Sequence, residues 1–141
     1  MAITGGCLCG KVRFAIEADK PITVRQCWCR VCQHLSAGGG TINAVFPKEA
    51  IKISGETSDF VSVADSGSIM HRRFCAGCGS PLFSEAEPRP HIIIVRVGAL
   101  DDPSLAAPSA IIWTKSAPAW ACFDPALPRS EAGAPPPAPK P

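Results

Sequence analysis

The chain has 141 residues, 46% of them hydrophobic, and a formal net charge of +2. This length and apolar content predict one domain with its own core, and the small charge gives no indication of a nucleic-acid partner. Because the first residues lack the basic and apolar stretches of a signal peptide, and no apolar run approaches the roughly 18 residues of a membrane span, we expect a soluble, cytoplasmic protein with no membrane partner.

Short β-type segments follow one another along the chain. Residues 10–17 alternate charged and apolar side chains, which predicts a half-buried strand whose Val12, Phe14 and Ile16 face inward. Residues 91–97 are apolar enough to form a central strand covered on both faces. Other strands are expected at residues 22–25, 41–46, 51–53, 59–63, 68–74, 81–83 and 110–113.

The remaining segments connect these strands or follow the last of them. Residues 33–36 are compatible with a single helical turn, which the glycines at 38–40 would end. The composition changes near the C-terminus, where residues 134–141 read APPPAPKP, a stretch that forms neither sheet nor helix. We therefore predict a mainly β domain over residues 1–128 and a flexible Pro/Ala-rich tail over residues 129–141.

Seven of the eight cysteines fall into three tight groups. The groups have C-x-C, C-x-C-x-x-C and C-x-x-C spacing, and the two cysteines of a C-x-C pair cannot easily form a disulfide with each other. In a reducing compartment such spacing indicates metal binding. The three groups are Cys7 and Cys9; Cys27, Cys29 and Cys32; and Cys75 and Cys78.

The two pairs together supply four thiolates, enough for a closed tetrahedral zinc site between the N-terminus and a turn far along the chain. Such a site, on Cys7, Cys9, Cys75 and Cys78, would stabilise the fold and leave no room for a substrate. We interpret it as structural.

The central group supplies three thiolates and leaves a fourth position open. A soft fourth ligand such as a thiol would suit this position, and it would lose its proton there and become a nucleophile at neutral pH. Cys27, Cys29 and Cys32 are therefore predicted to be both metal ligands and the catalytic centre, with a small thiol as substrate. The alternative is a second structural zinc site, completed by His34, His71, His91 or Cys122.

Five stretches of the sequence resemble the glutathione-dependent formaldehyde-activating enzyme family, which also includes centromere protein V. They are GGCLCGKVRF at residues 5–14, the C-x-C-x-x-C run, FCAGCGSPL at 74–82, GALDDP at 98–103 and the late Trp120. The resemblance extends from residue 3 to about residue 128.

The resemblance implies a single-domain β-tent fold with two zinc ions: a structural ion on the two cysteine pairs and a labile ion on the central group, where glutathione docks. It also implies a carbon-sulfur lyase that adds glutathione to formaldehyde to give S-hydroxymethylglutathione. In this sequence Trp28 stands where a histidine is common, and Gln33 and His34 replace a usual Arg-Lys pair.

Three functions follow from these observations. The first is a zinc-dependent lyase that acts on a glutathione-type thiol, with Arg30, Arg72 or Arg73 available to pair with its carboxylates. The second is a noncatalytic zinc module whose β surface binds another protein. The third, a thiol redox protein using Cys29 and Cys32, lacks the βαβ context that is usual for such motifs.

Overall fold

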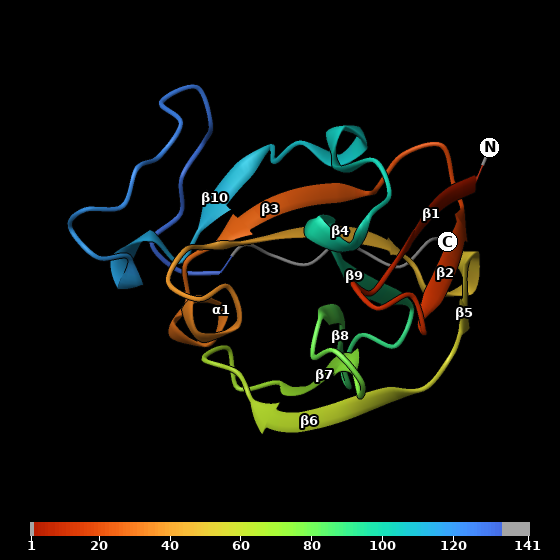
Figure 1. Ribbon diagram of the computed structural model, residues 1–141. Helices are drawn as coiled ribbons and strands as arrows, with labels where there is room; N and C mark the ends of the chain where they lie inside the picture. The colour runs from red at the N-terminus through yellow and green to blue at the C-terminus, as the bar shows by residue number, and fades with distance from the viewer. Residues whose placement is uncertain (1, 134–141) are drawn as a thin grey trace.

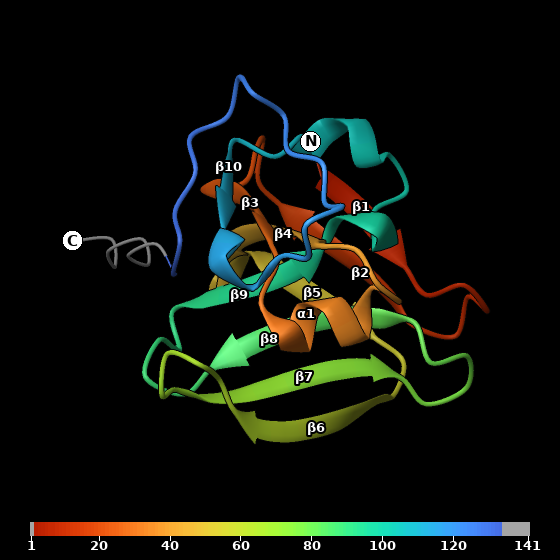
Figure 2. The ribbon, with the colours of Figure 1, turned by 90° about the vertical axis from the view of Figure 1, so that its left-hand side faces the viewer.

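The computed structural model describes residues 2–133, which form two sheets and one short helix (Figures 1 and 2). The smaller sheet has the order β1-β2-β5, with strands β1 (Ala2–Gly6), β2 (Arg13–Glu17) and β5 (Ile51–Ser54). The larger sheet has the order β10-β3-β4-β9-β8-β7-β6. Its strands are β3 (Thr23–Cys27), β4 (Thr41–Pro47), β6 (Thr57–Val63), β7 (Ile69–Cys75), β8 (Pro81–Ala86), β9 (Ile92–Arg96) and β10 (Ala110–Ile112).

The helical content is small. The one α-helix is α1 (Arg30–Leu35), and the described residues also contain the short 3₁₀ helices η1 (Lys48–Ala50), η2 (Val97–Ala99), η3 (Pro103–Ala106) and η4 (Thr114–Ser116). None of the helices in residues 2–133 has the length and apolar character needed to cross a lipid bilayer. The mainly β, β-tent fold expected from the sequence is confirmed, with two departures from antiparallel pairing: β10 runs parallel to β3, and a parallel bridge joins Ile111 to Arg129.

The hydrophobic core lies where the two sheets meet. Val12, Phe14 and Ile16 are buried, as the alternation over residues 10–17 predicts. The Phe14 ring packs edge-on against Phe83 of the large sheet, with 5.2 Å between the ring centroids. Strand β9 is central and buries side chains of both faces, also as predicted.

Strand β1 was not expected, because its sequence AITGG has little β character. It pairs with β2 along its whole length. Gly5 packs so closely that an added Cβ atom would overlap the Ala99 carbonyl oxygen and the Phe14 ring. The glycine therefore permits a close approach that no larger residue would allow.

Helix α1 begins three residues earlier than the predicted turn at residues 33–36, inside the central cysteine group. The Cys32 backbone N–H donates to the Cys29 sulfur at 3.4 Å, so Cys29 caps the helix. The helix ends before Ala37, which has a left-handed φ of 60°. The large sheet curves so that β3 and β6 lie above and below α1 in Figure 1, and Figure 2 shows α1 lying across the face of this sheet.

The segment that follows β10 returns to pair with it. The Ile111 N–H donates to the Pro128 carbonyl at 3.0 Å, the Ser130 N–H donates to the Ile111 carbonyl at 2.9 Å, and the Trp113 N–H donates to the Ala132 carbonyl at 3.1 Å. The predicted boundary between domain and tail, at residues 128 and 129, thus falls within a hydrogen-bonded segment. Residues 134–141 of the predicted tail lie outside the described residues.

Two truncations test this pairing. Truncation after Gly133 is expected to leave the melting temperature unchanged. Truncation after Arg129 removes Ser130 and Ala132 and, at about 1 kcal/mol for each lost backbone hydrogen bond, should lower the melting temperature by several degrees. Differential scanning calorimetry of both chains beside the full-length chain checks this. Equal melting temperatures for the two truncated chains would contradict it.

Candidate metal centres

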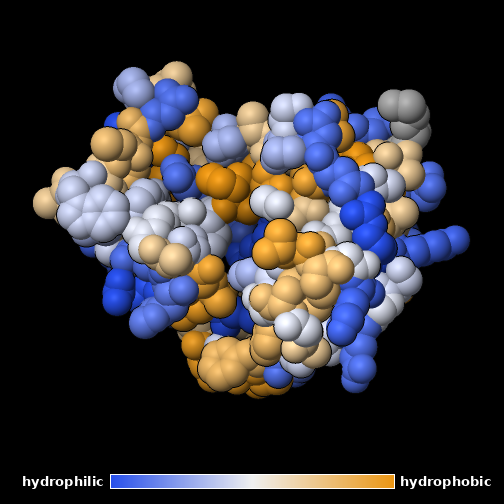
Figure 3. Space-filling model, in the orientation of Figure 1, coloured by the Kyte–Doolittle hydropathy of each residue, from blue (hydrophilic) through white to orange (hydrophobic). Residues whose placement is uncertain are grey.

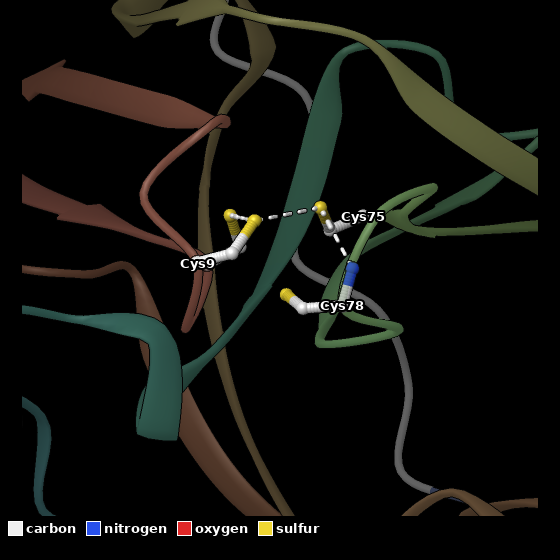
Figure 4. A group of neighbouring side chains, drawn as sticks. Cys9, Cys75 and Cys78 are labelled. Carbon is white, nitrogen blue, oxygen red and sulfur yellow. Dashed lines mark hydrogen bonds between the residues drawn. The ribbon is translucent and has the colours of Figure 1, made fainter.

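The four sulfurs of the two cysteine pairs converge. Cys7 and Cys9 follow β1, Cys75 ends β7, and Cys78 lies in the tight turn before β8. All four Sγ atoms lie within 4.8 Å of one another; the Cys7–Cys9 separation is 3.6 Å and the Cys9–Cys75 separation is 3.7 Å. Zinc–sulfur bonds of about 2.3 Å in a tetrahedron place sulfurs about 3.8 Å apart. The cluster therefore fits such an ion, and Figure 4 shows Cys9, Cys75 and Cys78 pointing toward one centre.

Backbone N–H groups surround these sulfurs. The Val12 N–H donates to Cys7 Sγ at 3.2 Å, and the Gly77 and Cys78 N–H groups donate to Cys75 Sγ at 3.3 and 3.5 Å. The hydroxyl and the backbone N–H of Ser80 lower the pKa of the Cys78 thiol to about 5. Because hydrogen bonds to the charged form favour it, this turn stabilises the thiolates that a metal ion requires.

The closed cluster also joins the two sheets. The β1–β2 loop supplies two sulfurs from the small sheet, and the β7–β8 turn supplies two from the large sheet. An ion at this point would fix the relative position of the sheets. The location suits a structural role, as the sequence predicts.

The three sulfurs of the central group form a second cluster. Cys27 is the last residue of β3, Cys29 caps α1, and Cys32 lies in its first turn. Their Sγ atoms lie within 4.8 Å of one another. Cys27 and Cys32 are buried, and Cys29 is half-buried. Because a strand end and a helix start hold the sulfurs, the chain itself keeps them together.

No other cysteine, histidine, aspartate or glutamate within residues 2–133 belongs to this cluster. His34 and Cys122 are exposed. His71 is held between carboxylates, with Nδ1 2.6 Å from Asp59 and Nε2 2.8 Å from Glu87. The candidates for a fourth ligand, among them the half-buried His91, are thus not gathered with the three sulfurs.

The three thiols influence one another's ionisation. Hydrogen bonds from Cys27 and Cys29, followed by the positive charge of Arg96 and a hydrogen bond from Thr41, lower the pKa of the Cys32 thiol. The neighbouring sulfurs and burial raise the pKa of Cys27. The positive charge of Arg96 therefore favours a negative charge on this cluster.

Arg96 is a site residue that the sequence analysis missed. It lies at the end of β9 and is 8% exposed. One guanidinium nitrogen donates to the Asn43 side-chain oxygen, and another donates to the Ser84 hydroxyl at 2.6 Å. A charged residue in the otherwise apolar run HIIIVRV was the signal that could have revealed it, because charges are seldom fully buried without a partner.

Comparison with known proteins adds to this geometry. The family model described as "Glutathione-dependent formaldehyde-activating enzyme" matches residues 2–116. The chain belongs to this family. A curated protein of Halomonas elongata, named provisionally as an enzyme of this kind, is 27% identical over 105 residues, which cover 72% of this chain and 67% of that protein. A crystal structure of a Rhodobacter sphaeroides protein shares the fold, with a TM-score of 0.55 and 21% identity, over 70% of this chain and 88% of that one.

Trp28 and Gln33, which the sequence analysis distinguishes from the residues expected in this family, have structural roles here. Trp28 is buried, and its ring packs edge-on against Trp120 and Phe123, with centroid distances of 6.3 and 5.9 Å. The Gln33 amide donates to the carbonyl oxygens of Trp28 at 2.8 Å and Ser116 at 2.9 Å. Both residues therefore hold the segment of residues 116–123 against the central cluster.

A cavity of about 620 Å³ borders the closed cluster and approaches the central one. Cys7 of the closed cluster lines it, and so do Thr41 and Arg96, which influence the pKa of Cys32. Arg13 and Asp101 form an ion pair at 2.6 Å on its rim. A small molecule in this cavity would contact Thr41 and Arg96, the neighbours of Cys32, although no cysteine of the central cluster lines the cavity.

Proposed function

We propose that this chain is a zinc-dependent carbon-sulfur lyase that joins glutathione, or a related small thiol, to formaldehyde or another small aldehyde. The observation that carries the proposal is the three-sulfur cluster, which has no fourth ligand among residues 2–133 and whose neighbours Thr41 and Arg96 line a cavity. The family model and the name of the Halomonas elongata relative support the same reaction.

The chain's own residues would bind the metal ion and surround the reactants. Cys27, Cys29 and Cys32 would hold the ion, which would supply a coordination position where a substrate thiol becomes a thiolate. Thr41 and Arg96 stand beside Cys32, and the positive charge of Arg96 favours anions at this point. The cavity admits both reactants and orients them, which makes their combination effectively intramolecular.

The overall step is an addition. The substrate sulfur gives up its proton and forms a bond to the aldehyde carbon, while the π electrons of the carbonyl move to its oxygen, which takes up a proton. A hemithioacetal results without any oxidant or reductant. Free glutathione is only a few per cent thiolate at neutral pH, so full ionisation raises the reactive fraction roughly tenfold or more.

We assign the closed cluster of Cys7, Cys9, Cys75 and Cys78 to a structural zinc. Its four sulfurs leave no coordination position open, and it joins the two sheets. The proposal therefore predicts two zinc ions of unequal lability.

Metal release and reaction rate together test the function. A mild chelator is expected to remove one zinc quickly and the other slowly. Exchange NMR should show hemithioacetal formation accelerated by the two-zinc protein over the unaided reaction, and the acceleration should disappear when the labile zinc is removed. The absence of acceleration by the two-zinc protein, with formaldehyde and with larger aldehydes, would overturn the lyase.

The edge strand β6 favours a second candidate function, a noncatalytic zinc module that binds another protein. Phe60, Val61 and Val63 are exposed on β6, and Ile69 is exposed on the neighbouring β7. An edge strand can accept a strand of another chain, and apolar side chains add to such contacts. Two equally inert zinc ions without catalysis would favour this module.

A further inference from the structure

A row of polar side chains crosses the face of the large sheet that α1 covers. The register pairs Cys27 with Thr41, Asn43 with Arg96, and Arg72 with Ser84, and paired residues share a face. The Asn43 amide donates to the Thr41 hydroxyl at 3.0 Å, and Arg96 links Asn43 to Ser84. The row thus runs from the central cysteine cluster on β3 across the sheet to Arg72 on β7.

Two cations in this row lack a carboxylate partner. Arg72 and Arg96 are each 8% exposed, and neither forms an ion pair with a carboxylate of residues 2–133. Arg72 donates to the Ser62 hydroxyl at 2.6 Å, and the Nε of Arg96 has no partner among the described residues. Burying a charge without a counterion is costly, and a guanidinium has five N–H donors to satisfy.

The neighbouring Arg73 differs from Arg72 and Arg96, because it forms an ion pair with a carboxylate. Its guanidinium lies 3.1 Å from the Glu85 carboxylate, and Glu85 also accepts from Lys48 at 2.7 Å. Arg73 therefore has a carboxylate partner within the protein. Arg72 and Arg96 have none among residues 2–133, although the Cys32 sulfur lies beside Arg96.

Arg72 and Arg96, together with Arg73, border an otherwise largely apolar cavity of about 310 Å³. Leu35 of α1 and the rings of Phe60 and Phe74 give it apolar walls. In the orientation of Figure 1, the surface of the molecule shows hydrophilic groups recessed between apolar ones near its middle (Figure 3). An apolar cavity with a cationic end suits a ligand that carries an anionic group on an apolar body.

We propose that Arg72 and Arg96 form a carboxylate subsite beside the central cysteine cluster. A planar carboxylate matches the forked donors of a guanidinium, and it would add a negative charge to the one that Cys32 places beside Arg96. The subsite serves a substrate of the reaction proposed above, on which its assignment to catalysis rests.

Arg96 connects this subsite to the reacting centre. Arg96 lines both cavities, and its hydrogen bond to Asn43 continues to Thr41, which pairs with Cys27 of the cluster. A substrate whose carboxylate contacts Arg72 and Arg96 therefore has the cysteine cluster immediately beside it. The proposal predicts that the substrate class is a thiol or an aldehyde that carries a carboxylate.

Binding of a simple probe tests the subsite without any catalytic assay. Benzoate is expected to bind the two-zinc protein, and the uncharged isostere benzamide should bind at least about tenfold more weakly, because charge-assisted hydrogen bonds are lost. Isothermal titration calorimetry measures both, and chemical-shift changes locate the probe. Equal affinity for benzoate and benzamide would overturn the subsite.

Matched variants assign the binding to the arginines. Arg72→Gln should weaken benzoate about tenfold or more while keeping the fold, since Arg72 has a single side-chain hydrogen bond within the protein. Arg72→Lys, which keeps the charge, should retain part of the affinity. Arg89→Gln, which removes a charge that lines neither cavity, should leave it unchanged. Unaltered benzoate binding by a folded Arg72→Gln protein would contradict the proposal.

Competition identifies which reactant carries the carboxylate. Displacement of benzoate by glutathione, but not by its dimethyl ester, would assign the subsite to the thiol, whereas displacement by glyoxylate would assign it to the aldehyde. Displacement by neither would overturn the link to the reaction.

The binding and rate measurements together distinguish the subsite from the proposed reaction. Benzoate binding without acceleration of hemithioacetal formation would refute the lyase and keep the subsite. Acceleration without benzoate binding would refute the subsite alone.

Discussion

Replacement of Cys75 by alanine is expected to abolish cooperative folding. Cys75 is 1% exposed, and its sulfur lies 3.7 Å from that of Cys9. The variant would leave three sulfurs at the closed cluster and uncouple the two sheets that the cluster joins. Binding of a structural zinc is worth roughly 10 kcal/mol or more, which is comparable to the stability of a whole domain.

Thermal unfolding followed by circular dichroism, with zinc content measured on the same sample, checks this prediction. Cys122→Ala is the matched control, because Cys122 is exposed and belongs to neither cluster. The control should melt like the unmodified protein. A Cys75→Ala protein with an unchanged melting temperature would refute the structural assignment of the closed cluster.

The second large effect is expected at Cys29. Cys29→Ser removes one of three sulfurs from the central cluster, so the labile zinc and all acceleration of hemithioacetal formation should be lost. The fold should survive on the closed cluster. Serine is a favoured residue at the start of a helix, so its hydroxyl can take over the capping of α1 that the Cys29 sulfur provides.

Metal analysis, melting temperature and exchange NMR of the same Cys29→Ser sample separate these effects. One zinc per chain, a nearly unchanged melting temperature and an unaccelerated reaction are expected, with Cys122→Ser as control. Retention of full acceleration by a one-zinc variant would show that the central cluster is not the reacting centre. Loss of the fold would show that this cluster too is structural.

Local patterns were sufficient to predict much of this fold. Charge and apolar alternation over residues 10–17 identified β2, and the apolar run at 91–97 identified the central β9. Cysteine spacing identified the three groups of potential metal ligands, because the cysteines within each group are close in sequence. Two of these groups combine in the closed cluster, and the third forms the central cluster. In these cases the sequence and the structure depend on the same short-range geometry.

Other features depend on contacts between distant segments, which no local pattern encodes. Strand β1 forms because Gly5 fits against Ala99 and Phe14, and residues 128–132 are ordered by pairing with β10. Arg96 faces the cysteine cluster only because β9 lies beside β4 in the sheet. These contacts require the strand order, which the sequence analysis did not predict.

The two cysteine clusters differ in how much chain must be arranged before each can form. Cys27, Cys29 and Cys32 lie within six residues, whereas the Cys9–Cys75 contact joins residues 66 positions apart. Closing a long loop costs more entropy and delays folding. During synthesis, the central cluster is complete before Cys75 has been added to the chain. We therefore expect a nascent chain to capture its labile ion first, and the ion that joins the two sheets to bind last, as the step that completes folding.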